Sequence, residues 1–96
     1  MEILVTYDVA TDKPAGERRL RRVAKACEGF GQRVQKSVFE CTLGAADLER
    51  LQHKLAGLID EKEDSLRLYR LQEPREKYLR VLGRPLAYDV HDPLVL

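Results

Sequence analysis

The sequence predicts a single α+β domain in which two helices pack on one face of an antiparallel sheet. Stretches with alternating apolar and polar residues are interspersed with stretches whose apolar residues recur every three to four positions. These stretches follow the order strand, helix, strand, strand, helix, strand, and a further short strand comes last. The chain has 96 residues, of which 44% are hydrophobic, enough for one small core.

The first strand, residues 1–9, is the segment around which the others are arranged. Its two faces carry Ile3, Val5, Tyr7 and Val9 on one side, and Leu4, Thr6 and Asp8 on the other. Apolar residues on both sides predict a central strand that is covered on both faces. Asp8 has two interpretations. It starts a turn, as Asp often does, or it lies where a cation or substrate meets the sheet.

The remaining elements follow in chain order. Asp12 and Pro14 indicate the start of a helix over residues 15–28, which Gly29 and Gly31 end. Strands over 32–35 and 37–43, with a bend at 36–37, lead to a second helix over 45–59 and a charged turn over 60–64. Strands over 65–71 and 77–82 flank a loop that contains Pro74. The apolar stripes of the two helices are Leu20, Val23, Ala24 and Cys27, and Leu48, Leu51, Leu55, Leu58 and Ile59.

This order is that of a ferredoxin-like βαββαβ sandwich with an extra C-terminal strand. Right-handed crossovers place both helices on one face of the sheet. The other face holds too many apolar and β-branched residues for contact with water. We therefore expect a two-fold homodimer through that face, a domain over residues 1–83 and a tail over residues 84–96.

Composition narrows the functional classes. A net charge of +1 from 17 basic and 16 acidic residues says nothing about a nucleic-acid partner. No apolar run is long enough for a membrane span, and no basic segment precedes the first strand as in a signal peptide, so we expect a cytoplasmic protein. Cys27 and Cys41 are expected to be buried reduced thiols, and a zinc site is not expected because His53 and His91 stand alone.

The first helix is strongly basic. Its cations are Arg18, Arg19, Arg21, Arg22 and Lys25. They form either an ordinary solvated face that pairs with Glu17 and Glu28, or a phosphate-binding face. A second polar cluster surrounds Ser37, where hydrogen bonding at the start of a strand is the simpler interpretation.

Four segments together resemble a known family. They are the first strand with its end at 7–9 (YDV), 19–27 (RLRRVAKAC), 31–41 (GQRVQKSVFEC) and 59–71 (IDEKEDSLRLYRL). In this order they are similar to the small CRISPR-associated adaptation protein, the second of the two core adaptation proteins. The resemblance implies a ferredoxin-like homodimer with metal-dependent endonuclease activity on RNA or double-stranded DNA. It also implies a role in antiviral defence, as the central scaffold and partner of the CRISPR integrase in spacer acquisition.

The resemblance also implies roles for individual residues. Asp8 corresponds to the metal-binding acid, so it would be the catalytic residue and would bind Mg²⁺ or Mn²⁺. The residues expected to bind nucleic acid are Arg18, Arg19, Arg22, Lys25 and Ser37, with Tyr7 and Phe39 as structural neighbours. The strand at 77–82 would pair with the other protomer.

Two functions remain open from the sequence. Asp8 at the strand end favours a nuclease. The basic helix, together with only one credible catalytic acid per chain, favours a non-catalytic scaffold that binds duplex DNA and the integrase.

Overall fold

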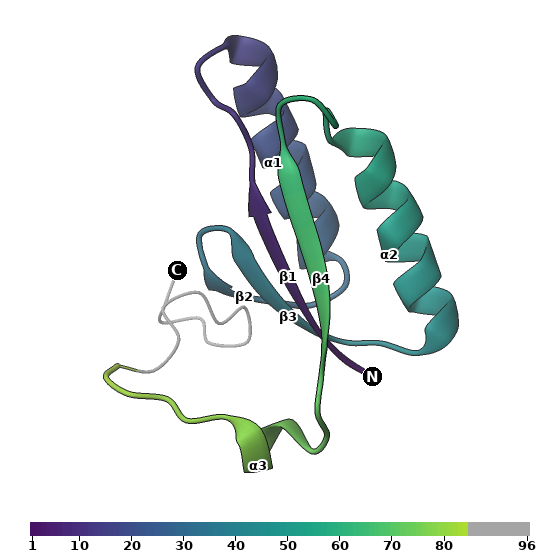
Figure 1. The fold of residues 1–96 in the computed structure, drawn as a ribbon, viewed down its shortest axis with the longest axis vertical. Helices are drawn as coiled ribbons and strands as arrows, with labels where there is room; N and C mark the ends of the chain where they lie inside the picture. Colours follow the sequence, from purple (N-terminus) through teal and green to yellow (C-terminus); the bar gives the residue numbers. More distant parts are fainter. Residues whose placement is uncertain (85–96) are drawn as a thin grey trace.

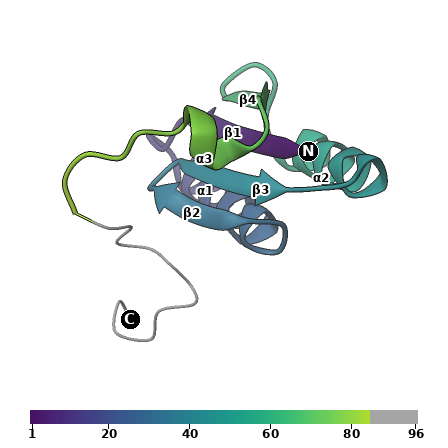
Figure 2. The same ribbon diagram turned by 90° about the horizontal axis from the view of Figure 1, so that it is seen from below.

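A computed structural model describes residues 1–84 and confirms the predicted α+β sandwich. The sheet is antiparallel with four strands in the order β2-β3-β1-β4. Helices α1 and α2 lie on one face of this sheet (Figures 1 and 2). The elements are β1 (Glu2–Asp8), α1 (Pro14–Glu28), β2 (Gln32–Gln35), β3 (Val38–Thr42), α2 (Ala45–Leu58), β4 (Ser65–Leu71) and α3 (Arg75–Tyr78).

Strand β1 is central, as predicted, and lies between β3 and β4. Val5, for example, is opposite Phe39 on β3 and Leu68 on β4. Alternate side chains of β1 from Ile3 to Tyr7, and Val9 just after the strand, are buried under the helices. They belong to one core with Val23, Cys27, Leu51 and Leu55. This core removes enough apolar surface from water to hold both helices on the sheet.

The opposite side of β1 is not covered within a single chain; a second copy is predicted to cover it. Leu4 and Thr6 are only half-buried, and Asp8 is exposed. We call this side of the sheet the open face. It mixes apolar residues such as Leu4 with the charged residues Glu40 and Arg67, so it is less apolar than the sequence pattern indicated.

Helix α1 begins as predicted, with Pro14 in its first turn and Lys13 as its N-cap residue. Its buried side differs slightly from the predicted stripe. Val23, Ala26 and Cys27 are buried, whereas Leu20 and Ala24 are half-buried at the edge of the core. The stripe is therefore rotated toward Ala26, because α1 also contacts α2 and not the sheet alone.

The expected C-terminal strand over residues 77–82 does not form within the described part of the chain. Residues 77 and 78 of the expected strand belong to helix α3. This helix lies at the end of the sheet where β1 begins (Figure 1). The physical reason is a competing contact, since Arg75 turns back to Glu2 and Glu40 instead of continuing beside β4. Val81 and Leu82 are then 62% and 93% exposed. Of the predicted tail over 84–96, residues 85–96 lie outside the described residues.

Candidate active site and basic helix face

Asp8 is the last residue of β1 and therefore belongs to the strand itself, not to a turn. Its β4 neighbour in the register is Ser65. Alternation along β1 places its carboxylate on the open face with Leu4 and Thr6, on the side of the sheet away from α1. Within residues 1–84 no group donates a hydrogen bond to this exposed carboxylate. Both of its oxygens are therefore free to meet a ligand.

The turn between β2 and β3 is fixed beside Asp8 by Tyr7. The Tyr7 backbone N–H donates to the Ser37 carbonyl over 3.1 Å, and the Tyr7 hydroxyl donates to the Lys36 carbonyl over 3.2 Å. The Tyr7 ring stacks on the buried Phe39 ring, with 6.4 Å between the centroids. Burial of the phenol is the main reason that the pKa of Tyr7 is raised. Tyr7 and Phe39 thus support the end of β1 from the core side.

Arg19 lies in a different environment from the other helix cations. Its Nε is 2.8 Å from Asp64 Oδ2 and its Nη2 is 3.2 Å from Oδ1, and the Asp64 side chain is 0% exposed. The predicted charged turn over 60–64 therefore contributes a buried carboxylate. The sequence indicates the direction of Arg19 but not its partner, because Arg19 precedes the buried Val23 and Cys27 at helical spacing and so continues their row toward the core.

The other four cations of α1 form one exposed surface, which we call the basic face. Arg18, Arg21, Arg22 and Lys25 line a shallow depression on the outer side of the helix. The simpler interpretation paired them with Glu17 and Glu28. Instead, Glu28 lies 3.8 Å from Arg33, and no ion pair to the basic face occurs within the described chain. Four unneutralised cations on one surface suit a polyanion such as a nucleic-acid backbone.

The structure does not bring all predicted site residues together. Asp8 and Ser37 lie at the same end of β1. The cations of the basic face are exposed on α1. Helix α1 packs on one face of the sheet (Figure 2), whereas Asp8 lies on the other, open face. A single chain therefore presents a carboxylate and a cationic surface in two different directions.

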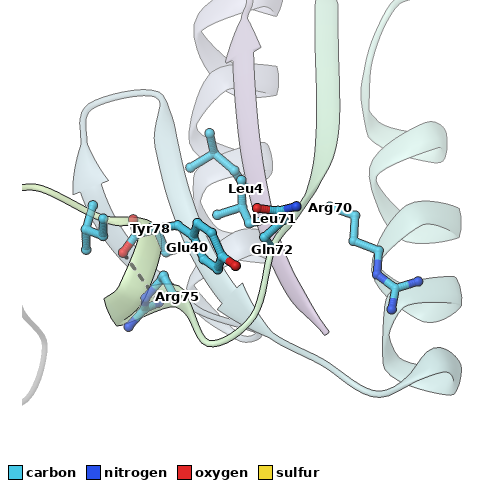
Figure 3. Close-up of a pocket in the computed structure, with 8 residues that line it drawn as sticks. Leu4, Glu40, Arg70, Leu71, Gln72, Arg75 and Tyr78 are labelled. Carbon is cyan, nitrogen blue, oxygen red and sulfur yellow. Dashed lines mark ion pairs between the residues drawn. The ribbon is translucent and has the colours of Figure 1, made fainter.

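Sequence reasoning missed a pocket at the other end of the open face. It lies between α3 and the sheet, where Arg75 Nη1 is 3.5 Å from Glu40 (Figure 3). Arg75 Nη1 also lies 3.4 Å from Glu2. Leu4 and Tyr78 line the same pocket. The two glutamates of this face are thus already paired with Arg75, which leaves Asp8 as the carboxylate with free oxygens on β1.

The donor chemistry favours a hard cation over zinc. Among residues 1–84, no three His, Cys, Asp or Glu side chains come close enough to hold a metal together. Burial raises the pKa of Cys27 to about 12 and that of Cys41 to about 11, so both remain protonated thiols. Mg²⁺ needs only one or two carboxylates because it keeps several water ligands. One chain offers a single exposed carboxylate of this kind on the open face without a protein partner among the described residues, Asp8.

In the part of the chain with a described structure, no helix is both long and apolar enough to cross a bilayer.

Comparison with known proteins identifies similar chains over the whole length. Residues 1–78 match a family model described as CRISPR associated protein Cas2. Over 96 residues the chain is 57% identical to "CRISPR-associated endoribonuclease Cas2 1" of Moorella thermoacetica, with 100% of both chains covered. It is 47% identical over 95 residues to "CRISPR-associated endonuclease Cas2" of Halalkalibacterium halodurans, with 99% of each chain covered.

Solved structures agree with this result. The crystal structure of Streptococcus pyogenes Cas2 at pH 6.5 matches with a TM-score of 0.78 and 51% identity, covering 86% of this chain and 100% of that chain. The hypothetical protein TT1823 from Thermus thermophilus matches with a TM-score of 0.72 and 34% identity, covering 86% of this chain and 90% of that chain.

The buried carboxylate of Asp64 predicts a specific loss of stability in acid. The hydrogen bond from Arg19 is the main cause that lowers the pKa of Asp64 to about 2. Because the folded pKa lies below the unfolded value of about 4, this group stabilises the fold above pH 4, and its contribution is lost as the pH falls from about 4 to about 2. In urea unfolding, native protein should exceed Asp64→Asn in stability by a constant amount at pH 5–7, and the difference should shrink below about pH 4.

Asp47→Asn is the matched control, because Asp47 forms an exposed ion pair with Arg50 over 2.6 Å on α2. Exposed pairs contribute little to stability, so this variant should follow the native protein at every pH. A stability difference between native protein and Asp64→Asn that does not change down to pH 2 would contradict the assignment.

Proposed function

Because the chain belongs to the CRISPR-associated Cas2 family, we propose that it is a cytoplasmic, metal-dependent endonuclease that cleaves phosphodiester bonds of RNA or double-stranded DNA in CRISPR spacer acquisition. The observation that carries this proposal is the Asp8 carboxylate, which is exposed on the open face and accepts no hydrogen bond from any residue in the range 1–84. The names of the relatives, endoribonuclease and endonuclease, support a hydrolase of this class.

A divalent cation fits Asp8 best if two protomers share it. One Asp8 gives a cation a single carboxylate, whereas two copies related by a two-fold axis through the open face give it two. We propose Mg²⁺ or Mn²⁺ at this position. Such an ion, when bound, activates water and neutralises charge on a phosphodiester. The chain's own part is to hold the carboxylate at a rigid strand end, where Tyr7 fixes the neighbouring turn.

Replacement of the proposed metal ligand tests the nuclease. Asp8→Asn keeps the size of the side chain and removes its charge, so Mg²⁺-dependent cleavage should fall by more than about 100-fold, beyond the loss typical of outer-shell residues. The measurement is cleavage of labelled RNA and duplex DNA, each with Mg²⁺, Mn²⁺ or a chelator. Asp12→Asn is the control, since Asp12 is an exposed acid in the following loop. Cleavage by Asp8→Asn at the native rate would refute the proposal.

A dimer through the open face is the second testable part. Leu4 lies at the centre of this face, between Glu40 on β3 and Tyr69 on β4. Sedimentation at micromolar concentration should give about twice the chain mass of 11.0 kDa. Leu4→Glu should dissociate the dimer, because it places a second carboxylate beside Glu40, whereas Gln52→Glu on the exposed side of α2 should not. A monomeric native protein would exclude the shared metal site.

The basic face favours a second function, a scaffold that binds duplex DNA and the CRISPR integrase. Its four exposed cations point away from Asp8, so they do not serve cleavage of a strand held at Asp8 of the same chain. In a two-fold dimer this surface occurs twice, which suits a duplex that lies across both copies. Arg19 is omitted from this surface because its guanidinium is engaged by Asp64.

Charge reversal of the basic face tests the scaffold. Arg18→Glu combined with Arg22→Glu should weaken duplex binding and flatten its salt dependence, by about one unit of slope per lost phosphate contact. Arg50→Glu combined with Lys54→Glu makes the same charge change on the exposed side of α2 and should leave the slope unchanged. Asp8→Asn should bind as tightly as the native protein or slightly more tightly. If the Arg18/Arg22 variant keeps the native affinity and slope, the DNA surface must lie elsewhere, with Lys36, Arg67, Arg70 and Lys77 as the remaining candidates.

A further inference from the structure

The backbone of Ala10, two residues after Asp8, is held at both its N–H and its carbonyl. Its N–H donates to Asp64 Oδ1 over 3.1 Å. Its carbonyl oxygen lies so close to Gly16, in the first turn of α1, that a Cβ atom on Gly16 would overlap it. A residue larger than glycine at position 16 would therefore push the loop away from the helix. The loop that leaves β1 thus has one position relative to α1 and to the turn before β4.

The Asp64 carboxylate that holds Ala10 has four donors, and these come from three segments. Besides Ala10 N–H and two nitrogens of Arg19, the Asp60 N–H donates to Oδ2 over 2.9 Å. Arg19 itself is fixed, because it stands one turn before the fully buried Val23 on α1. A fully buried carboxylate that loses one donor cannot turn to water for another. The arrangement therefore selects one geometry, even where a buried ion pair adds little net stability.

The hydrogen bonds to Asp64 lie next to the end of β1, which carries Asp8. Asp8 is opposite Ser65 in the last pair of the β1–β4 register, and Asp64 directly precedes Ser65. On the other side of β1, the Tyr7 N–H donates to the Ser37 carbonyl. The backbone is thus fixed immediately before Asp8 and two residues after it, while the Asp8 side chain itself has no protein donor among the described residues.

We propose that Arg19 and Asp64 are positioning residues, which fix the end of β1 that carries the Asp8 carboxylate by holding the backbone N–H of Ala10. The effect on cleavage rests on the proposed function of Asp8, but the effect on geometry does not. Arg19 then acts within the fold by positioning the proposed metal ligand Asp8. It does not contact the phosphate of the nucleic acid. Mutation of a residue that orients a metal ligand without touching the metal commonly lowers metal affinity or activity by about 10- to 100-fold.

Two variants and a matched control pair test this. Arg19→Lys keeps the charge but loses the two-pronged contact, and Asp64→Asn keeps the shape but leaves Arg19 without a charged partner. Asp47→Asn and Arg50→Lys are the same substitutions in the exposed ion pair of α2. The readouts are amide hydrogen exchange at Ala10, the ¹³C signal of the Asp8 carboxyl group, and kcat and KM for Mg²⁺-dependent cleavage at a temperature where each variant is folded.

We expect Ala10 to exchange at least about tenfold faster in both variants, with core amides of β1 and β3 unchanged, as for a local opening. The Asp8 carboxyl signal should shift or broaden. The value of kcat should fall by about 10- to 100-fold, with KM within about twofold of the native value. The Asp47 and Arg50 controls should change none of these. If Asp64→Asn does not fold, Arg19→Lys alone decides.

An unchanged Ala10 exchange rate together with an unchanged Asp8 signal in a folded variant would overturn the proposal, and so would a native kcat in a variant whose Ala10 is released. Failure of the nuclease proposal looks different. In that case Asp8→Asn cleaves at the native rate, while exchange at Ala10 and the Asp8 signal still report whether Arg19 and Asp64 position the strand end.

Discussion

The arrangement of this protein depends on the alternation of side chains along β1. Because β1 is the central strand and one of its faces is packed under both helices, Ile3, Val5 and Tyr7 must be buried. Every even-numbered residue is then forced onto the open face, and Asp8 with them. A shift of β1 by one residue would bury Asp8 and expose the core residues. The same packing that stabilises the sheet therefore also decides which face of the sheet carries the candidate catalytic carboxylate.

This constraint separates the two proposed activities in space. Asp8 belongs to the open face, and the basic face belongs to the outer side of α1. A chain that binds a duplex through its arginines does not by this contact bring the phosphodiester to Asp8. Nuclease and scaffold are thus two surfaces of one molecule, and neither function requires the other to be lost. A two-fold dimer duplicates both surfaces and, through the open face, allows two Asp8 residues to approach each other.

Arginine residues of this protein have three different surroundings. Arg18 and Arg22 are solvated, whereas Arg19 between them is engaged by a buried carboxylate. Helical geometry explains the difference, since residue 19 continues the row of Val23 and Cys27 toward the core. Beyond the helix, Arg75 lies across the end of the open face and pairs with Glu2 and Glu40. The carboxylates near each arginine thus decide whether its charge is paired or exposed to solvent. The number of basic residues in the sequence does not show which of them can bind a ligand.

Local patterns in the sequence were sufficient for most of the fold. The period of two in residues 1–9 and 37–43 and the period of 3.6 in the two helices depend only on which side of each element faces the core, so the elements, their order and the sheet followed from them. Asp8 as the candidate acid was visible for the same reason, because it ends an otherwise apolar strand.

Tertiary structure alone decided the contacts between segments far apart in the chain. The pairing of Arg19 with Asp64 spans 45 positions and that of Arg75 with Glu2 spans 73, so no local period encodes them. Helix α3 takes up only residues 77 and 78 of the expected strand, next to Arg75, which pairs with carboxylates on β1 and β3. A charged residue shows in the sequence that it needs a partner or water, but only the packed chain determines which of the two it meets.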